Sequence, residues 1–93
     1  MSVEVRLHAI IHGRVQGVSF RYYAMQRARE LGVTGYARNL WDESVEVVAE
    51  GQRALVDELL AFLRVGPRAA FVTGVDVRWL APTNEFQRFE VRH

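Results

Sequence analysis

Residues 3–31 decide the fold and read VEVRLHAIIHGRVQGVSFRYYAMQRAREL. From residue 3 to residue 11, apolar and polar side chains alternate, which is the pattern of a half-buried strand. After a loop with two glycines, apolar residues recur at the three-to-four spacing of an amphipathic helix, at Phe20, Tyr23 or Ala24, Ala28 and Leu31. Ser19 stands where an N-cap is expected and Gly32 where a C-terminal cap is expected. The stretch therefore predicts a strand, a loop and a helix.

The rest of the chain continues in the same way. We expect further strands at residues 33–38, 45–50 and 70–79, with a bulge near Gly74, and a short last strand from 86 or 87 to 92. A second helix is expected between Gly51 and Gly66-Pro67, with one apolar face made by Leu55, Leu59, Phe62 and Leu63. The order is βαββαβ plus a short terminal strand, in one domain spanning residues 1–93. It predicts a two-layer α+β sandwich with a mixed, mostly antiparallel sheet, both helices on one face, and the first and third strands adjacent. Charged side chains would cover the open face of the sheet.

Composition excludes several kinds of chemistry. The 93 residues include no cysteine, so there is no disulfide, thiolate nucleophile or cysteine metal site. All 12 basic side chains are arginine, which excludes Schiff-base chemistry and a lysine-containing phosphate loop. A net charge of +1 argues against nucleic acid as a partner. We expect a cytoplasmic protein, since no signal segment and no apolar run of about 18 residues is visible.

The loop from Gly13 to Arg21 is the candidate site. A loop with two glycines that leads into a helix can present free backbone N–H groups at the positive end of the helix dipole. Arg21, in the first helical turn, would add a charged, two-pronged donor that matches phosphate oxygens. Two glycines between a strand and a helix are also ordinary turn residues, so spacing alone leaves anion binding as one of two interpretations.

The residues of this loop resemble a family signature. The run Gly13-x-Val15-Gln16-Gly17-Val18-x-Phe20-Arg21 is similar to the first signature of the acylphosphatase family, and Gly35-Tyr36-Ala37-Arg38-Asn39 resembles the second. The resemblance covers essentially the whole chain. It implies a ferredoxin-like α/β sandwich that hydrolyses the carboxyl–phosphate bond of acyl phosphates without metal or cofactor.

The resemblance also implies a role for individual residues. The phosphate would be bound by Val15, Gln16, Gly17, Val18, Ser19, Phe20 and Arg21. Arg21 would grip the phosphate and Asn39 would orient the attacking water. The implied partners are a small acyl phosphate as substrate and inorganic phosphate as product. We expect the protein to be a monomer that binds neither nucleic acid nor a membrane. The sequence departs from the family where a glycine is usual in the hairpin turn, at Glu43, and this puts the conformation of the turn in doubt.

Other residues near the loop favour structural roles. His12 could be proposed as a base, but a histidine that closes a strand is more often structural. Ser19 could be proposed as a nucleophile, yet no base at a suitable spacing would activate it, and N-capping explains it better. Gln16 is expected to support the loop, and Trp41 to cover an edge of the core.

Three other functions are compatible with this architecture. An RNA-binding module would stack bases on aromatic side chains of its third strand, whereas residues 44–50 contain no aromatic side chain and two acids. A small-molecule regulatory domain would normally accompany a partner domain. An inactive acylphosphatase that only binds anions is disfavoured because Arg21 and Asn39 are both present.

Overall fold

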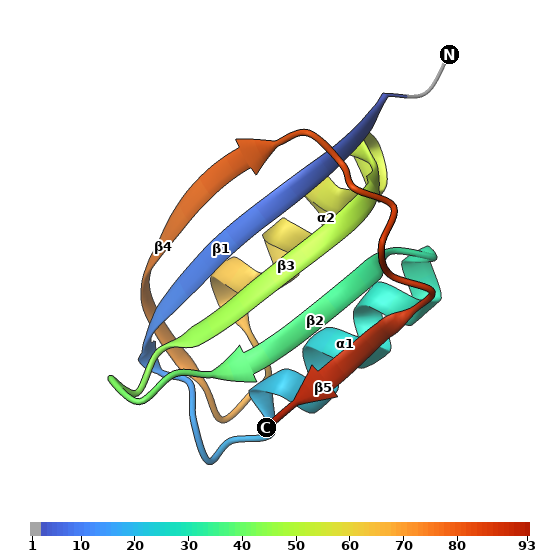
Figure 1. Ribbon diagram of the computed structural model, residues 1–93. Helices are drawn as coiled ribbons and strands as arrows, with labels where there is room; N and C mark the ends of the chain where they lie inside the picture. Colours follow the sequence, from blue (N-terminus) through green and yellow to red (C-terminus); the bar gives the residue numbers. More distant parts are fainter. Residues whose placement is uncertain (1–2) are drawn as a thin grey trace.

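The computed structural model describes residues 3–93 and places one five-stranded sheet against two helices (Figure 1). The elements are β1 (Glu4–Arg14), α1 (Phe20–Leu31), β2 (Thr34–Asn39), β3 (Val45–Gln52), α2 (Arg53–Val65), β4 (Phe71–Leu80) and β5 (Phe89–Arg92). The predicted order of elements and the two-layer α+β sandwich are confirmed. No helix in residues 3–93 is long and apolar enough to cross a membrane.

The sheet has the strand order β4-β1-β3-β2-β5. β1 lies antiparallel to both β3 and β4, β2 lies antiparallel to β3, and β5 joins the edge parallel to β2. The adjacency of the first and third strands was predicted. In the β1–β4 pair the register shifts between His12 and Gly13, leaving Thr73 without a partner next to Gly74. The predicted bulge is therefore present, one residue before the glycine.

Apolar side chains from the two layers meet in one core. The sheet contributes Leu7, Ala9, Ile11, Ala37, Val45, Val47, Ala49 and Phe89, and the helices contribute Phe20, Ala24, Ala28, Val56, Leu59 and Leu63. Of the two alternatives at the start of α1, Ala24 is buried and Tyr23 is 44% exposed. α1 ends as expected at Gly32, whose left-handed backbone lets its N–H reach back to the last turn. On α2 the buried stripe includes Val56 and Leu60, while Leu55 and Phe62 are only partly buried.

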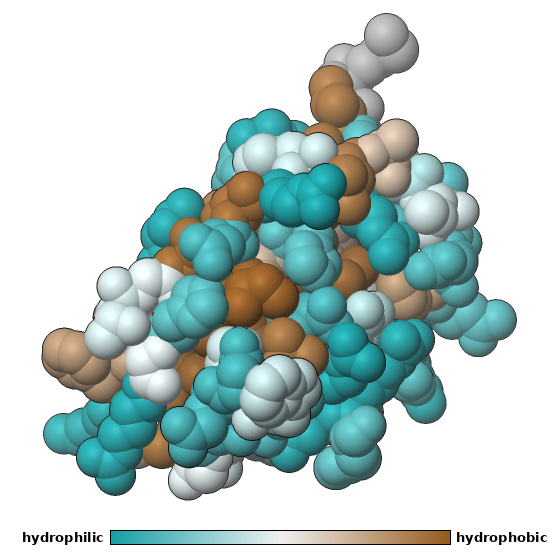
Figure 2. All heavy atoms as spheres, turned by 60° about the vertical axis from the view of Figure 1, so that its left-hand side comes forward, coloured by the Kyte–Doolittle hydropathy of each residue, from teal (hydrophilic) through white to brown (hydrophobic). Residues whose placement is uncertain are grey.

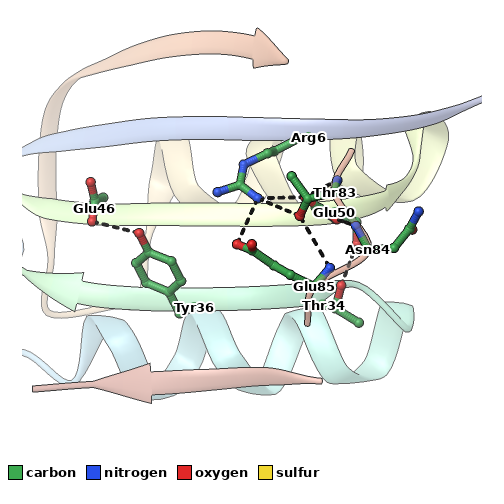
Figure 3. A network of polar contacts seen from close by, with 8 residues as sticks. All are labelled: Arg6, Thr34, Tyr36, Glu46, Glu50, Thr83, Asn84 and Glu85. Atoms are coloured by element: carbon green, nitrogen blue, oxygen red, sulfur yellow. Dashed lines mark hydrogen bonds and ion pairs between the residues drawn. The ribbon is translucent and has the colours of Figure 1, made fainter. Parts of the chain in front are cut away.

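The chain between β4 and β5 crosses the open face of the sheet, which is therefore less exposed than predicted. Glu50 is only 4% exposed there and accepts hydrogen bonds from the backbone N–H groups of Thr83 (2.9 Å) and Asn84 (2.8 Å) (Figure 3). The Arg6 guanidinium donates to the same carboxylate at 2.8 Å. Burial opposes ionisation, but these donors outweigh it and hold the pKa of Glu50 below its ordinary value. Glu50 thus fastens this connection to the sheet.

The last strand begins later than predicted, at Phe89 instead of residue 86 or 87. Phe86 lies over the open face, with its ring 5.8 Å from that of Tyr36 and 5.4 Å from the Arg6 guanidinium. The side chain of Phe86 packs on the open face of the sheet, and pairing with β2 begins three residues later, at Phe89.

The opposite edge of the sheet is formed by β4, which carries exposed apolar side chains at Phe71, Trp79 and Leu80. Figure 2, turned to bring this side forward, shows brown hydrophobic patches interrupted by hydrophilic side chains. Trp79 is partly covered by Arg53, whose guanidinium lies 3.8 Å from the centre of the indole. The apolar surface on this side is thus divided and does not form one continuous face.

Candidate functional site

The loop between β1 and α1 is anchored at both ends by buried side chains. Val15 is 1% exposed and Phe20 is 2% exposed, so the segment between them cannot move far from the core. Within the loop, Gly17 (φ 73°) and Ser19 (φ 60°) both have a left-handed backbone. Within residues 3–93, no protein acceptor takes a hydrogen bond from the backbone N–H of residues 16–20. The loop therefore offers a set of free donors at the N-terminus of a helix, where the dipole favours an anion.

Ser19 does not cap α1, contrary to the prediction. A capping serine has an extended backbone, from which its oxygen reaches the N–H groups of the first turn. Ser19 instead has φ 60° and ψ 28°, and its side chain makes no capping hydrogen bond. The left-handed conformation leaves the first-turn N–H groups without this partner, which is consistent with their use for a ligand.

Gln16 joins the loop to the hairpin turn between β2 and β3. Its Nε2 donates to the carbonyl oxygen of Leu40 at 2.7 Å and to that of Ser44 at 2.9 Å. This agrees with a supporting role for Gln16. Because Leu40 follows Asn39 directly, the same two hydrogen bonds connect the loop to the residue expected to hold water.

The hairpin turn between β2 and β3 has a left-handed residue at Glu43, the position where a glycine is usual in the family. Glu43 has φ 75°, and its N–H donates to the carbonyl of Leu40 at 3.2 Å. The side chain of Asp42 accepts hydrogen bonds from the N–H and the hydroxyl of Ser44, and these hold the pKa of Asp42 below its usual value. The turn therefore keeps the left-handed residue even without glycine, at a cost of about 1 kcal/mol.

Arg21 is oriented by a strand that is distant in the sequence. Its Nη1 donates to the backbone carbonyl of Arg92 at 2.7 Å and lies 3.5 Å from Nδ1 of His93. Sequence reasoning missed this contact, because nothing in the pattern of either segment relates residues 71 positions apart. One edge of the guanidinium is thus held by β5, which fixes the direction in which the rest of the group can face.

The predicted site residues gather around one pocket of about 610 Å³. It is lined by Val15, Gly17, Ser19, Phe20, Arg21, Tyr22, Met25, Asn39 and Val91. Arg21 and Asn39 therefore line the same pocket. Gln16 and Val18 do not line it, because Gln16 faces the hairpin turn and Val18 lines a neighbouring pocket. The wall formed by Tyr22, Met25 and Val91 was not predicted as part of a site.

The remaining candidates lie elsewhere or have other partners. His12 bonds to Asp76 at 2.8 Å on the open face of the sheet and does not line the pocket. Arg38 pairs with Glu46 at 2.8 Å. The expectation that Trp41 covers an edge of the core is wrong, because its side chain is 97% exposed at the hairpin turn. Asn39 thus lines the pocket together with Arg21 and part of the loop, and His12 does not.

Comparisons with known proteins agree on one family. The family model described as acylphosphatase matches residues 7–91. An acylphosphatase of Methylococcus capsulatus is 55% identical over 86 residues, which cover 92% of this chain and 94% of that protein. Two solved structures are also similar. The acylphosphatase of Bacillus subtilis has a TM-score of 0.92 and 28% identity, covering 96% of this chain and 99% of the other. For an acylphosphatase from Coxiella burnetii the values are 0.89 and 36%, covering 96% and 93%.

Proposed function

This chain belongs to the acylphosphatase family and hydrolyses the carboxyl–phosphate bond of acyl phosphates, and we propose that the β1–α1 loop, Arg21 and Asn39 carry out that reaction. One observation supports the assignment above others. Arg21 and Asn39 come from different elements, yet they line the same pocket as the loop whose N–H groups at residues 16–20 have no acceptor among residues 3–93. That combination provides charge, donors and a water-binding amide in one place.

The phosphoryl group would be bound by the loop and by Arg21. The transition state of phosphoryl transfer spreads negative charge over the three equatorial oxygens, so fixed donors around them lower the barrier. The loop N–H groups supply several such donors without reorganisation. The guanidinium of Arg21 supplies a permanent charge, and its position is set in advance by the carbonyl of Arg92.

Asn39 would place the attacking water. Its amide is neutral and takes no proton near neutral pH, so its role is orientation. The water oxygen forms a bond to phosphorus as the bond from phosphorus to the acyl oxygen breaks, and that electron pair leaves with the carboxylate. A phosphate oxygen accepts the proton from water. Because a carboxylate is a good leaving group, the step needs no strong general acid, and we propose that it needs no metal.

The test is phosphate release from benzoyl phosphate in the presence of EDTA. We expect wild type to be active, Arg21→Ala to lose both binding and rate, and Asn39→Ala to lose mainly kcat. Arg21→Lys should also fail, since an ammonium cannot make the two-pronged contact. Arg27→Ala is the matched control, because Arg27 lies on the same helix and does not line the pocket.

Two results would contradict the mechanism. One is activity that disappears with EDTA and returns with a divalent cation. The other is full activity in both the Arg21 and Asn39 variants, provided that circular dichroism shows them to be folded.

The domain organisation and the oligomeric state are part of the same proposal. The family model matches residues 7–91, which supports a single domain over the 93 residues. We propose that this domain acts as a monomer on small molecules alone and does not bind nucleic acid. Sedimentation velocity should then give one species near 10.7 kDa, unchanged by added RNA or DNA.

A further inference from the structure

A second pocket adjoins the pocket of about 610 Å³ that Arg21 and Asn39 line, which is called the phosphate pocket from here on. The two pockets meet at the N-terminus of α1. The volume of the second pocket is about 470 Å³, and its lining residues are Val18, Ser19, Tyr23, Pro67, Arg68 and Ala69. Ser19 is the residue that both pockets share. A substrate bound by the loop could thus extend from one pocket into the other.

The wall of this second pocket is held in place by the fold. It is formed by the loop between α2 and β4, which lies beside the β1–α1 loop (Figure 1). At one end of that loop, Gly66 donates to the carbonyl of Phe62 at 2.6 Å and lies directly against the ring of Phe20. Ala70 donates to the carbonyl of Pro67 at 2.9 Å, which closes a tight turn around Arg68. The pocket is therefore a formed feature of the surface.

Tyr22 and Tyr23 separate the two pockets. Tyr22 lines the phosphate pocket and Tyr23 lines the second one, and their rings meet edge to face with centroids 5.5 Å apart. With Val18, Pro67 and Ala69, Tyr23 gives the second pocket a mainly apolar wall. Such a wall suits the flat or aliphatic body of an acyl group.

Arg68 is the single charged residue of the second pocket. It is exposed, and within residues 3–93 no carboxylate lies within ion-pairing distance of it. The ion-paired carboxylates Glu46 and Glu50 lie on the open face of the sheet, and Asp57 pairs with Arg53 within α2. The guanidinium of Arg68 is thus available to a ligand that enters the pocket.

The direction of the reaction favours the second pocket, over the apolar wall of the phosphate pocket, as the place for the acyl group. The attacking and leaving oxygens lie roughly in line on opposite sides of phosphorus. Water held by Asn39 approaches from the β2 side, where Val91 of β5 also lies. The acyl oxygen must then depart on the side away from Asn39, and the second pocket, which Asn39 does not line, is reached from the loop through Ser19.

We infer that the second pocket binds the acyl group of the substrate, and that Arg68 selects acyl groups bearing a second negative charge at their far end. This inference rests on the proposed site, because it takes the phosphate to be bound by the loop and Arg21. It assigns to the enzyme a substrate class, acyl phosphates with an apolar body and an anionic end, and it assigns Arg68 and Tyr23 to specificity. Neither residue takes part in the chemical step.

Two substrates that differ by one carboxylate test the inference. Benzoyl phosphate and 4-carboxybenzoyl phosphate have the same ring and the same scissile bond. We expect wild type to favour the carboxylated substrate in kcat/KM by about two- to fivefold at low salt, the range of an exposed ion pair. In Arg68→Gln this ratio should fall to about one, through a higher KM for the carboxylated substrate. Arg64→Gln is the control, since Arg64 is an exposed arginine nearby that lines neither pocket.

A second variant tests the apolar wall. Tyr23→Ala should lower kcat/KM for benzoyl phosphate relative to acetyl phosphate by about threefold or more, because the benzoyl ring of the substrate loses its contact with the tyrosine ring.

The outcomes separate this inference from the proposed site. If the preference for the carboxylated substrate survives in Arg68→Gln, or falls equally in Arg64→Gln, the role of Arg68 is wrong. If wild type shows no preference between the two benzoyl phosphates, the inference also fails, while loss of activity in Arg21→Ala and Asn39→Ala would still support the phosphate site. If those two variants keep full activity, the proposed site itself is overturned.

Discussion

Removing the side chain of Gln16 should reduce both stability and turnover. Gln16→Ala deletes the hydrogen bonds to the carbonyls of Leu40 (2.7 Å) and Ser44 (2.9 Å). Each carbonyl keeps one other donor, because Glu43 bonds to Leu40 and Leu40 bonds to Ser44. No buried acceptor is left without a partner, so the cost is the net value of two hydrogen bonds, about 2 kcal/mol. In a domain of this size that corresponds to a fall of about 10 °C in Tm.

The effect on activity follows from the position of Asn39. Once the loop and the hairpin turn are no longer joined, Asn39 and the bound phosphate are held less closely together. A displacement of about 1 Å can cost up to about 100-fold in rate, so we expect kcat to fall by about tenfold or more, with a smaller change in KM. Urea unfolding and steady-state kinetics on benzoyl phosphate would measure the two effects.

Gln26→Ala is the control, because Gln26 is exposed on α1 and makes no side-chain hydrogen bond within the described part of the chain. We expect it to change stability by less than about 0.5 kcal/mol. The reasoning is refuted if Gln16→Ala unfolds at the same urea concentration as wild type and retains its kcat.

Three further predictions concern the hairpin turn, the open face of the sheet and the proposed phosphate site. Glu43→Gly should stabilise the protein by about 0.5 kcal/mol in urea unfolding, because relief of left-handed strain exceeds the added entropy of the unfolded chain, whereas Glu43→Ala should give no gain. The lowered pKa of Glu50 means that its stabilising effect is complete above its unfolded value of about 4.3 and is lost as pH falls through the folded value. Glu50→Gln should therefore be less stable at pH 7 and show a flatter decline of Tm between pH 5 and 3. Inorganic phosphate at 100 times its Kd should stabilise wild type by about 2.7 kcal/mol in calorimetry, and Arg21→Ala should lose this effect.

Local patterns in the sequence were sufficient for most of the fold. The alternation in residues 3–11 and the spacing of Phe20, Ala24 and Ala28 identify a strand and a helix because both patterns depend on neighbours a few residues away. The two signatures, at residues 13–21 and 35–39, pointed to Arg21 and Asn39, and the structure places both residues on one pocket. These predictions depended on short-range regularities that the tertiary structure left intact.

The features that sequence missed depend on contacts between distant segments. Phe86 was predicted as a possible start of the last strand, but its ring packs near Tyr36 and Arg6 on the open face of the sheet. Ser19 has the right residue type for a cap, yet its backbone is left-handed, and residue type alone does not fix that choice.

The charge distribution around the first turn of α1 favours the binding of an anion there. The first turn of α1 contains Arg21 and no acidic residue, so its side chains add to the positive potential of the helix end instead of balancing it. None of the residues lining the phosphate pocket is acidic either. The first turn of α2 also lacks an acidic residue, so the absence alone does not mark a site. An aspartate or glutamate in the first turn of α1 would stabilise it by about 0.3–1 kcal/mol. An acid at that position would repel phosphate. In the proposed site, the missing carboxylate, the left-handed Ser19 and the loop N–H groups that have no acceptor within residues 3–93 would act together, because each leaves the negative charge to be supplied by the substrate.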